Sequence, residues 1–317
     1  MYFFCYFLKY LNKFNILLFL IKIIIFFYII FIFNCMKNKG KELKNIDLKK
    51  LSSMHVGGKA KRLFVPKNIE QLNNIIKYSK KISKNCIILG NCSNIIFRDK
   101  VYRDVFVSMK GFDTIRVNGD IVSCGAGISL FTLCMFCEQH ELTGLEPLYG
   151  IPGSVGGAIA MNAGAFGDEI CNHLDEFVSL QDGEIKTKNK FDFAYRRGPL
   201  DSGEILIEAK FKLNKGKKEE IIKKQMQFLQ KRKSSQPSLP SCGSVFKRGK
   251  DFFPAMLIDG WGLKGLTVGG AMISAKHAGF IVNTNDASFE DVILLIQIVE
   301  WIAKSKGYVF EREIKII

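Results

Sequence analysis

Residues 150–165 read GIPGSVGGAIAMNAGA, and no other segment of this chain restricts its folding so strongly. Glycine and alanine dominate the segment, so its backbone N–H groups can approach a ligand closely and point at an anion. It lacks the Gly-Lys-Ser/Thr ending of a Walker loop, and it is not the Gly-x-Gly-x-x-Gly fingerprint of a dinucleotide-binding turn. A tight structural crossing between strands is the other interpretation that fits it.

A second turn supports the ligand-binding interpretation. Residues 86–89 are a short apolar run that predicts a strand, and the turn Gly90-Asn-Cys-Ser-Asn94 follows it. Such a turn exposes backbone amides, and its serine and asparagines add side-chain donors. Two loops of this kind around one core suit an extended diphosphate cofactor.

The first 35 residues differ in composition from the rest. They carry three lysines and no acidic residue, and between Ile16 and Phe33 the one polar residue is Lys22. Such a run predicts a membrane anchor or an uncleaved signal segment. A misassigned start fits equally well. The segment consists almost entirely of Phe, Ile, Leu, Tyr, Asn and Lys, as translated AT-rich leader sequence would, and ordinary polar sequence begins at Met36. Both interpretations stay open.

The net charge of the chain is +16, and most of it lies beyond residue 35. This charge favours acidic partners, namely nucleic acid, an anionic membrane surface or phosphorylated small molecules. Nucleic acid is disfavoured as a partner, because the sequence has no basic stripe interleaved with aromatic residues.

The 317 residues, of which 48% are apolar, are enough for about two domains with a sizeable core.

The cysteines and histidines predict no metal site. Seven of the nine cysteines lie beyond residue 35, scattered and odd in number, which is typical of reduced thiols in a cytoplasmic protein. Cys134 and Cys137 form a lone Cys-x-x-Cys, whereas zinc would need a second pair at suitable spacing. The pair lies in an apolar helical pattern, so buried structural thiols are favoured over a redox motif.

Helical and strand patterns alternate only loosely, which predicts an α+β fold rather than a doubly wound sheet. Helices are predicted over residues 69–82, 129–140, 219–231 and 288–304, the last with a Ser288-x-x-Asp291 capping box. Strands are predicted over residues 62–65 and 86–90, within 105–127 and 175–213, and over 308–317. Residues 144–167 give no assignment.

The glycine-rich segment resembles the flavin-binding core of the UDP-N-acetylenolpyruvoylglucosamine reductase family. Further strings match that family in order, and the match covers about residue 45 to the end. These strings are HVGGKA (55–60), LGNCSN (89–94), FAYR (193–196), QP (236–237), PSCGSVFK (240–247), GLKG (262–265), HAGFI (277–281) and FEREI (310–314).

The resemblance implies two FAD-binding subdomains of the vanillyl-alcohol-oxidase (PCMH) type, followed by an α+β substrate-binding domain. About 40 residues separate Arg196 from Gln236, which resembles the family's shorter type without an inserted capping unit. The predicted divisions are the hydrophobic segment 1–35, FAD-binding subdomains over 36–104 and 105–214, a substrate-binding domain over 215–306, and a C-terminal strand over 307–317.

The resemblance also implies a reaction. The family reduces UDP-N-acetylglucosamine enolpyruvate to UDP-N-acetylmuramate for peptidoglycan, with FAD and NADPH, in the cytoplasm. We expect a monomer, with an inner-membrane tether if residues 1–35 are real. A flavin oxidase with another substrate, or a membrane-tethered module that binds a nucleotide sugar, are the alternatives.

Three catalytic roles carry over from the family. Ser244 matches the proton donor, and its alternative is an ordinary turn serine. Arg196 matches the arginine that stabilises the developing enolate, while the neighbouring Arg197 fits a plain surface cation. Glu313 matches a carboxyl group that assists Arg196 or acts as an acid, although Glu311 lies two positions away on the same strand face.

The resemblance and the loop chemistry also assign binding residues. For the cofactor they are Gly90, Asn91, Ser93, Asn94, Gly153, Ser154, Gly156, Gly157, Asn162, Ala163 and Gly164. For the substrate they are Tyr195, which fixes the register of Arg196, and the cations Arg232, Lys247 and Arg248, which suit a diphosphate.

Three positions depart from the family's pattern. Cys92 replaces a glycine of the flavin turn, so we expect a positive φ to be difficult there and FAD binding to be weaker. Gly249 replaces a proline, so we expect a looser loop after Ser244. The glycine that often closes the family's last strand has no counterpart after Ile317.

Overall fold

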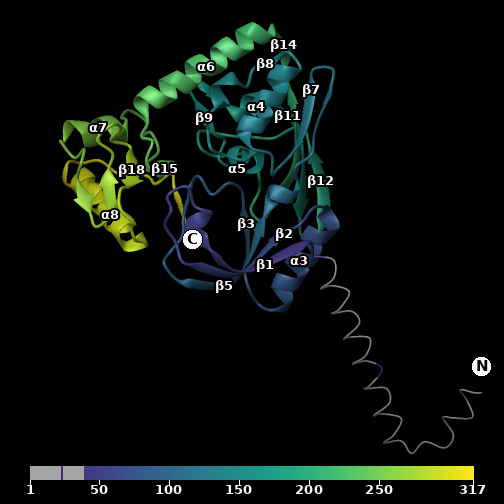
Figure 1. The fold of residues 1–317 in the computed structure, drawn as a ribbon, viewed down its shortest axis with the longest axis horizontal. Helices are drawn as coiled ribbons and strands as arrows, with labels where there is room; N and C mark the ends of the chain where they lie inside the picture. Colours follow the sequence, from purple (N-terminus) through teal and green to yellow (C-terminus); the bar gives the residue numbers. More distant parts are fainter. Residues whose placement is uncertain (1–22, 24–38) are drawn as a thin grey trace, which may run out of the picture.

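The computed structural model describes Ile23 and residues 39–317 (Figure 1). Apart from Ile23, the predicted hydrophobic segment 1–35 lies outside the described residues, so its two interpretations remain predictions. Within the described part of the chain, no helix combines the length and the apolar character needed to cross a membrane.

The first sheet carries the turn at residues 90–94. Its strands are β1 (Lys41–Asp47), β2 (Lys59–Val65), β3 (Cys86–Leu89) and β5 (Val101–Ser108), in the order β1-β2-β5-β3. Strands β2 and β3 run parallel to β5, and β1 is antiparallel to β2. The turn therefore begins at the carboxyl end of a parallel strand, which is a common place for a ligand site.

Helix α3 (Ile69–Lys81) covers this sheet and confirms the helix predicted over residues 69–82. It begins where the Asn68 side chain accepts a hydrogen bond from the Gln71 amide at 2.9 Å. Leu72 and Ile75 are fully buried on its inner face. Burial of each such side chain contributes roughly 1.5–3 kcal/mol.

The second sheet is antiparallel, in the order β12-β11-β13-β7-β6. Its strands are β6 (Ile115–Asn118), β7 (Ile121–Gly125), β11 (Leu174–Gln181), β12 (Glu184–Lys188) and β13 (Ile205–Lys212). They confirm the strands predicted within 105–127 and 175–213. Helices α4 (Leu130–Gln139) and α5 (Val155–Ala160) lie beside this sheet (Figure 1). Helix α5, about one and a half turns long, lies within residues 144–167, for which the sequence pattern predicts no element.

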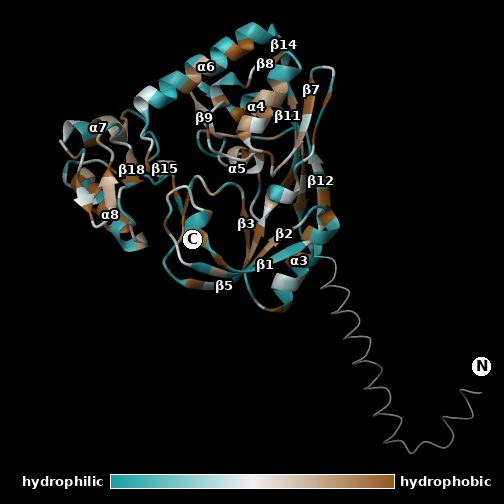
Figure 2. Ribbon diagram, viewed as in Figure 1, coloured by the Kyte–Doolittle hydropathy of each residue, from teal (hydrophilic) through white to brown (hydrophobic). Residues whose placement is uncertain are grey.

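The third part of the molecule follows a long helix. Helix α6 (Lys218–Ser235) lies along one side of the molecule and leads to the C-terminal part (Figure 1). Figure 2 shows that it is mostly hydrophilic. The elements beyond it are β15 (Ser241–Ser244), α7 (Pro254–Gly260), β16 (Thr267–Val268), β17 (Ala271–Ile273), β18 (Phe280–Asn283) and α8 (Phe289–Ser305). The strand order is β15-β18-β17-β16, and the predicted capping box of Ser288 and Asp291 is confirmed at the start of α8.

Short strand pairs and 3₁₀ turns complete the described part of the fold. The strand pairs are β8 (Leu142–Thr143) with β14 (Asn214–Lys215), β9 (Gly164–Ala165) with β10 (Asp168–Glu169), and β4 (Ile95–Ile96) with β19 (Lys315–Ile316). The 3₁₀ helices are η1 (Leu48–Lys50), η2 (Met109–Gly111), η3 (Glu146–Leu148) and η4 (Ile170–His173).

The predicted strand over residues 308–317 is wrong for most of its length. Only Lys315–Ile316 is a strand, and it pairs with β4 of the first body. Before it, Arg312 makes one isolated bridge to Phe246 in the C-terminal part. Because the segment bonds first to one body and then to another, it cannot keep a single continuous ladder.

The C-terminal part shares its core with the first body. The hydrophobic cluster beneath α8 contains Met54, Val56 and Ile96, which come from loops and strand β4 of the first body. These three side chains are fully buried against residues such as Ile281 and Phe310. The two parts are therefore packed together rather than joined by a linker alone.

The described cysteines are all unpaired. Cys134 and Cys137 are buried in α4, which confirms the prediction of buried structural thiols. Burial raises the pKa of the Cys137 thiol to about 12 and also raises the pKa of Cys134. Both are therefore protonated near neutral pH, in the form that is a poor nucleophile.

Candidate active site

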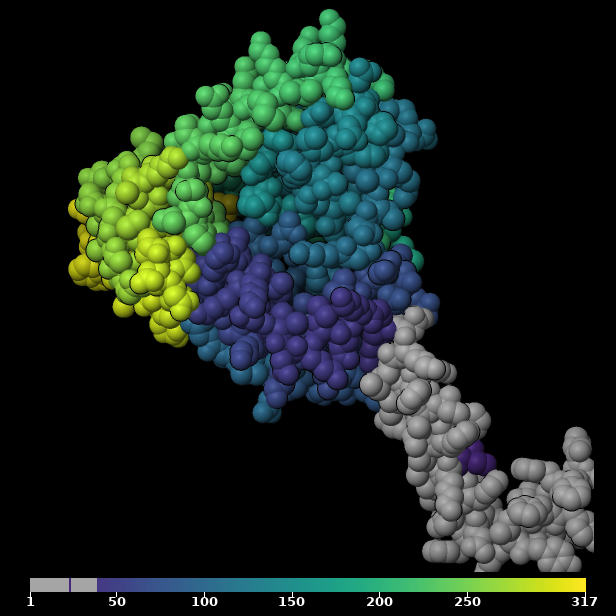
Figure 3. Space-filling view, in the orientation of Figure 1, coloured from purple at the N-terminus to yellow at the C-terminus, as the bar shows by residue number. Residues whose placement is uncertain are grey.

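A cleft of about 890 Å³ opens where the three parts meet. Figure 3 shows the hollow beneath α6, between the C-terminal part and the rest of the molecule. Its volume lies at the upper end of the range of small-molecule sites. Both loops that the sequence singled out line it, as do Arg196, Ser244 and Glu313. The structure thus brings the predicted catalytic residues to one place from segments far apart in the chain.

The first loop contributes Gly90, Asn91, Cys92, Ser93 and Asn94 to the cleft wall. Among the described residues, the amides of residues 91–93 donate no hydrogen bond. Successive free N–H groups in a turn form an anion-binding concavity. The Asn94 side chain, by contrast, is held by a hydrogen bond, since its Nδ2 donates to the Glu313 carbonyl at 3.0 Å.

The structure corrects our expectation that a positive φ is difficult at Cys92. Its φ is +53°, so the turn keeps the left-handed backbone that glycine would adopt more readily. The side chain is buried in the core of the first body, and its thiol donates to the Gly90 carbonyl at 3.8 Å. Apolar burial therefore offsets the backbone strain of about 1–2 kcal/mol. The predicted weakening of FAD binding remains a prediction.

The glycine-rich loop lies against the first loop in the cleft wall. Ser154 is the N-cap of α5, and its Oγ accepts from the Gly157 amide at 3.3 Å. Gly153, Ser154, Gly157, Ala163 and Gly164, which are predicted to bind the cofactor, line the cleft. A Cβ at Gly90 would lie 2.4 Å from the Ser154 Oγ, so the two loops touch where they meet.

This contact yields a prediction for Gly90→Ala. The added methyl group must displace the Ser154 hydroxyl and open its cap on α5, so we expect the purified protein to lose most of its flavin. The ratio of visible to ultraviolet absorbance measures this. Gly260→Ala is the matched control, because a Cβ there meets nothing within 4 Å. Equal flavin content in both variants would contradict the prediction.

Two predicted cofactor residues do not line the cleft. Gly156 packs its Cα against Ala126, where a Cβ would lie 3.0 Å from the Ala126 Cβ. Asn162 is fully buried and is bonded to other parts of the protein. The structure therefore gives both residues packing contacts behind the cleft wall, and their contact with a cofactor stays a prediction.

Arg196 stands on a tight turn and meets Glu313 from the C-terminal segment. The Arg196 Nε donates to the Glu313 Oε1 at 2.6 Å, and its Nη2 donates to the Gly164 carbonyl at 3.4 Å. Both side chains are largely buried, at 18% and 14% exposure. The neighbouring Arg197 is exposed and has no side-chain partner among the described residues, which matches the surface-cation interpretation.

The partners of Glu311 and Glu313 distinguish these two carboxylates. Glu311 is 72% exposed and pairs with Lys247 at 2.5 Å, whereas Glu313 faces Arg196. Burial raises the pKa of Glu313, and the charge and hydrogen bond of Arg196 oppose that effect. Glu313 therefore takes up a proton more readily than an ordinary glutamate, which suits a carboxyl group placed near an anionic substrate.

Ser244 ends strand β15 beside the C-terminal segment. Gly243 before it has a φ of +78°, and a register shift between Ser241 and Ser244 turns the chain toward the cleft. The Glu313 amide donates to the Val245 carbonyl at 2.8 Å, which places Glu313 beside the serine. Among the described side chains, none pairs with the Ser244 hydroxyl, so it is available to a ligand in the cleft.

The predicted substrate residues take different places. Arg232 lines the cleft, half-buried and without a carboxylate partner, and burial lowers its pKa. Its buried Nε has no hydrogen-bond partner among the described residues. Tyr195, Lys247 and Arg248 are not part of the cleft wall. The Tyr195 Oη accepts from the Arg248 amide at 3.2 Å, and the Arg248 guanidinium lies 5.0 Å from the Tyr195 ring centre.

The loop at Gly249 closes on itself. The Gly249 amide donates to the Phe252 carbonyl at 3.0 Å, and a Cβ at Gly249 would lie 2.4 Å from the Phe252 ring. Glycine thus allows the ring to approach the backbone. The looser loop that we expect here remains a prediction.

Sequence reasoning missed several residues in and beside the cleft. Lys315 lines it, and the alternation of side chains from Glu313 could have indicated this. Lys233 also lines it, one residue after the predicted Arg232. Phe166, which contacts the cleft residue Arg232, had no signal in sequence. Its ring stacks on Phe228 of α6 at 5.2 Å, and the Arg232 guanidinium lies over it at 5.2 Å.

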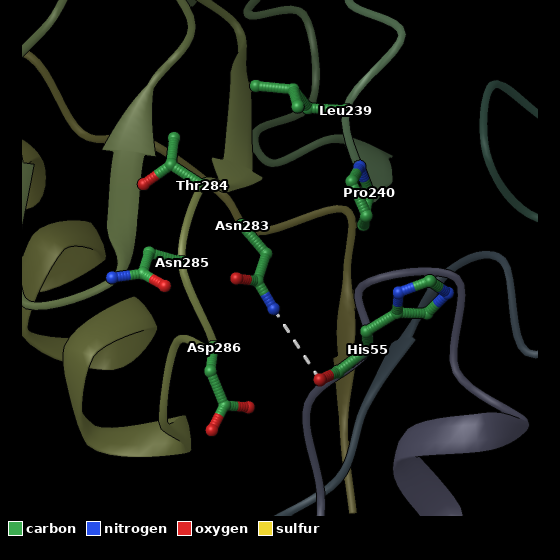
Figure 4. Close-up of a pocket in the computed structure, with 7 residues that line it drawn as sticks. All are labelled: His55, Leu239, Pro240, Asn283, Thr284, Asn285 and Asp286. Atoms are coloured by element: carbon green, nitrogen blue, oxygen red, sulfur yellow. Dashed lines mark hydrogen bonds between the residues drawn. The ribbon is translucent and has the colours of Figure 1, made fainter.

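A smaller hollow of about 360 Å³ adjoins the cleft and shares His55, Leu239 and Pro240 with it (Figure 4). There the Asn283 Nδ2 donates to the Met54 carbonyl at 3.1 Å and to the His55 carbonyl at 3.5 Å. These bonds join the C-terminal part to the first body.

The described residues contain no group of three or more side chains suited to hold a metal ion.

Comparisons with known proteins bear on this arrangement. Residues 234–317 match the family described as UDP-N-acetylenolpyruvoylglucosamine reductase, C-terminal domain, and residues 60–187 match the FAD binding domain family. A UDP-N-acetylenolpyruvoylglucosamine reductase 2 of Bacillus cereus is 41% identical over 276 residues, which cover 85% of this chain and 90% of that protein. The reductase of Caldanaerobacter subterraneus is 38% identical over 285 residues, covering 88% and 94%.

A solved structure agrees in fold. The crystal structure of UDP-N-acetylenolpyruvylglucosamine reductase from Thermus caldophilus superposes with a TM-score of 0.77 at 32% identity, covering 87% of this chain and 98% of that one. This agreement confirms the predicted α+β fold with FAD-binding subdomains and a C-terminal domain. The chain therefore belongs to the UDP-N-acetylenolpyruvoylglucosamine reductase family.

Proposed function

We propose that this protein reduces UDP-N-acetylglucosamine enolpyruvate to UDP-N-acetylmuramate, with FAD as the bound cofactor and NADPH as the reductant, in the synthesis of peptidoglycan precursors. One observation carries the proposal. A single cleft holds the Arg196–Glu313 pair and the Ser244 hydroxyl beside two loops that carry backbone amides without partners among the described residues. The names of the relatives above support the same reaction.

The residues of the cleft fit FAD. The amides of residues 91–93 and of Gly153 and Ser154 have no partner in the described part of the chain and are suited to a diphosphate, and the small side chains of the glycine-rich loop leave room for a flat ring system. Gly90, Asn91, Ser93, Asn94, Gly157, Ala163 and Gly164 complete the set that would hold the cofactor. When bound, FAD supplies hydride-transfer chemistry, and NADPH renews it.

Arg196 stabilises negative charge on the substrate. Addition of a hydride to one carbon of the enolpyruvyl double bond develops an enolate on the pyruvyl carboxylate side. A guanidinium already fixed by Glu313 and the Gly164 carbonyl faces that charge without reorganising. Glu313 holds the Arg196 Nε and, in its protonated form, does not repel the carboxylate.

Ser244 completes the addition by supplying the proton. Its Oγ holds a proton at the cleft wall and gives it to the carbon next to the one that receives the hydride. Hydride and proton together saturate the double bond. Arg232 would bind the substrate diphosphate, because an arginine without a carboxylate partner is free for a phosphate. Tyr195, Lys247 and Arg248 would reach the substrate if the loop after Ser244 closes over it.

We further propose that the protein acts as a monomer in the cytoplasm, with a membrane tether if residues 1–35 are part of the mature chain. Seven unpaired thiols in the described part of the chain fit a reducing compartment. Size-exclusion chromatography with light scattering measures the oligomeric state.

The visible spectrum of the purified full chain tests the function. We expect a yellow protein that bleaches with NADPH under anaerobic conditions and regains its colour when the enolpyruvyl sugar is added. Colour regained only with oxygen would instead indicate a flavin oxidase. A colourless protein that stays without FAD but binds UDP-sugars tightly would contradict the proposal and favour a nucleotide-sugar-binding module.

A further inference from the structure

The Asn162 side chain lies behind the cleft wall and contacts three different segments. The residue is fully buried. Its Nδ2 donates to the Glu169 Oε2 at 2.6 Å and to the Ala194 carbonyl at 3.0 Å, and its Oδ1 accepts from the Cys171 amide at 3.3 Å. Both N–H groups and the oxygen of this amide bond to the protein, and Asn162 does not line the cleft.

Glu169 sets the orientation of the Asn162 amide. A carboxylate can only accept hydrogen bonds, so the NH₂ group of Asn162 must face it. That choice places the oxygen toward the Cys171 amide and the second N–H toward the Ala194 carbonyl. The three bonds are therefore mutually consistent in one orientation of the side chain.

Ala194 begins the turn that carries Arg196. Its amide and carbonyl exchange hydrogen bonds with Arg197 at 2.8 and 2.9 Å, which closes a turn around Tyr195 and Arg196. Arg196 itself has a φ of +56°, an unfavourable backbone conformation for a side chain of this size. Such a conformation persists only where the surroundings hold it.

The same turn rests on the glycine-rich segment. The Gly198 amide donates to the Ala160 carbonyl at 3.3 Å, and a Cβ at Gly198 would lie 1.8 Å from the Ile159 carbonyl oxygen. The Arg196 Nη2 reaches the Gly164 carbonyl. Residues 159–164 thus form a platform for the arginine turn, and Ala163 and Gly164 within it also line the cleft.

We propose that Asn162 is a positioning residue for Arg196, and this inference rests on the role of Arg196 in the proposed function. Its bond to the Ala194 carbonyl fixes the start of the turn, and the platform fixes its end. Loss of that bond frees a turn whose backbone is strained, and the guanidinium then leaves its place beside Glu313. The glycine-rich segment would in this way align the arginine as well as hold the cofactor.

A double variant that combines Asn162→Asp with Glu169→Gln separates the bond to Ala194 from the rest of the network. The new glutamine side chain can donate to the new aspartate, and this aspartate can still accept from the Cys171 amide. The charge balance and two of the three bonds therefore remain. A carboxylate has no N–H for the Ala194 carbonyl, so the third bond is replaced by a repulsive contact between two acceptor oxygens. Asn172→Ala is the matched control, because Asp168, at 3.0 Å, is the one partner of this exposed amide among the described residues.

Stopped-flow absorbance measures the two half-reactions of each full-length variant. For the double variant we expect wild-type flavin content and wild-type reduction by NADPH. Reoxidation by the enolpyruvyl sugar should be about 10- to 100-fold slower, the loss typical of a misplaced catalytic group. The control should match the wild type in both halves.

Three results would overturn the inference. They are wild-type reoxidation in the double variant, equal slowing of both half-reactions, and loss of flavin or of the folded state, since the last two place the effect of Asn162 elsewhere. Failure of the proposed function looks different. In that case the wild-type protein itself does not reoxidise with the enolpyruvyl sugar.

Discussion

Ser244→Ala is expected to leave flavin reduction by NADPH at the wild-type rate and to slow reoxidation by the enolpyruvyl sugar by about 10²- to 10⁴-fold, the usual contribution of a positioned proton donor. The substitution removes one oxygen that has no hydrogen-bond partner among the described side chains, so no other bond of the protein is broken. Strand β15 keeps its pairing with β18, because that pairing uses the backbone.

Anaerobic stopped-flow at the flavin absorbance band separates the two halves of the Ser244→Ala reaction. The NADPH half serves as the internal control for folding and cofactor content. Reaction in deuterated water adds a second reading, because a proton supplied by Ser244 gives the wild-type reoxidation a solvent isotope effect. Equal slowing of both halves would show that Ser244 shapes the cleft rather than donating the proton.

Arg196→Lys should slow reoxidation by about 10²- to 10³-fold, the range found when one donor to a developing oxyanion is removed. A lysine keeps the charge but not the planar fork, so it cannot hold Glu313 and the Gly164 carbonyl while also facing the substrate. The effect should fall on the rate constant for reoxidation more than on the concentration of substrate needed to saturate it.

Arg197→Lys is the matched control for Arg196→Lys. It makes the same change on the neighbouring exposed residue, whose side chain has no partner within the described part of the chain. We expect wild-type rates from it. A similar loss in both variants would mean that the turn, rather than the Arg196 guanidinium, is sensitive to the exchange.

Local chemistry explains why much of the fold is predictable from sequence. Helix α3 follows from a capping asparagine and apolar residues at helical spacing, and α8 follows from a Ser288–Asp291 capping box. The antiparallel strands follow from alternating side chains and glycine turns such as Gly119. Each of these signals acts over a few residues, so the sequence alone carries it.

The site is predictable in part for a different reason. Ser244, Arg196 and Glu313 came from the resemblance, and the choice of Glu313 over Glu311 depended on register. Nothing in the sequence reveals that Glu313 meets a residue 117 positions away. The buried role of Asn162 also could not be read, because it depends on Ala194 from another loop.

Two expectations failed because tertiary contacts outweigh local preference. The backbone at Cys92 takes a positive φ, since its thiol side chain is buried in the core of the first body. The segment after Tyr308 is not one strand, because its aromatic residues pack in the C-terminal part before Lys315 pairs with β4.

The shared core beneath α8 has a thermodynamic consequence. Met54, Val56 and Ile96 belong to the first body by chain position but complete the interior of the C-terminal part. Neither part can lose its structure without exposing apolar surface of the other to water, at a cost of about 25 cal/mol for each Å². Heat or denaturant is therefore expected to act on these two parts as one cooperative unit, and Ser244 and Glu313 stay aligned with the turn at residues 90–94 of the first body until both parts unfold.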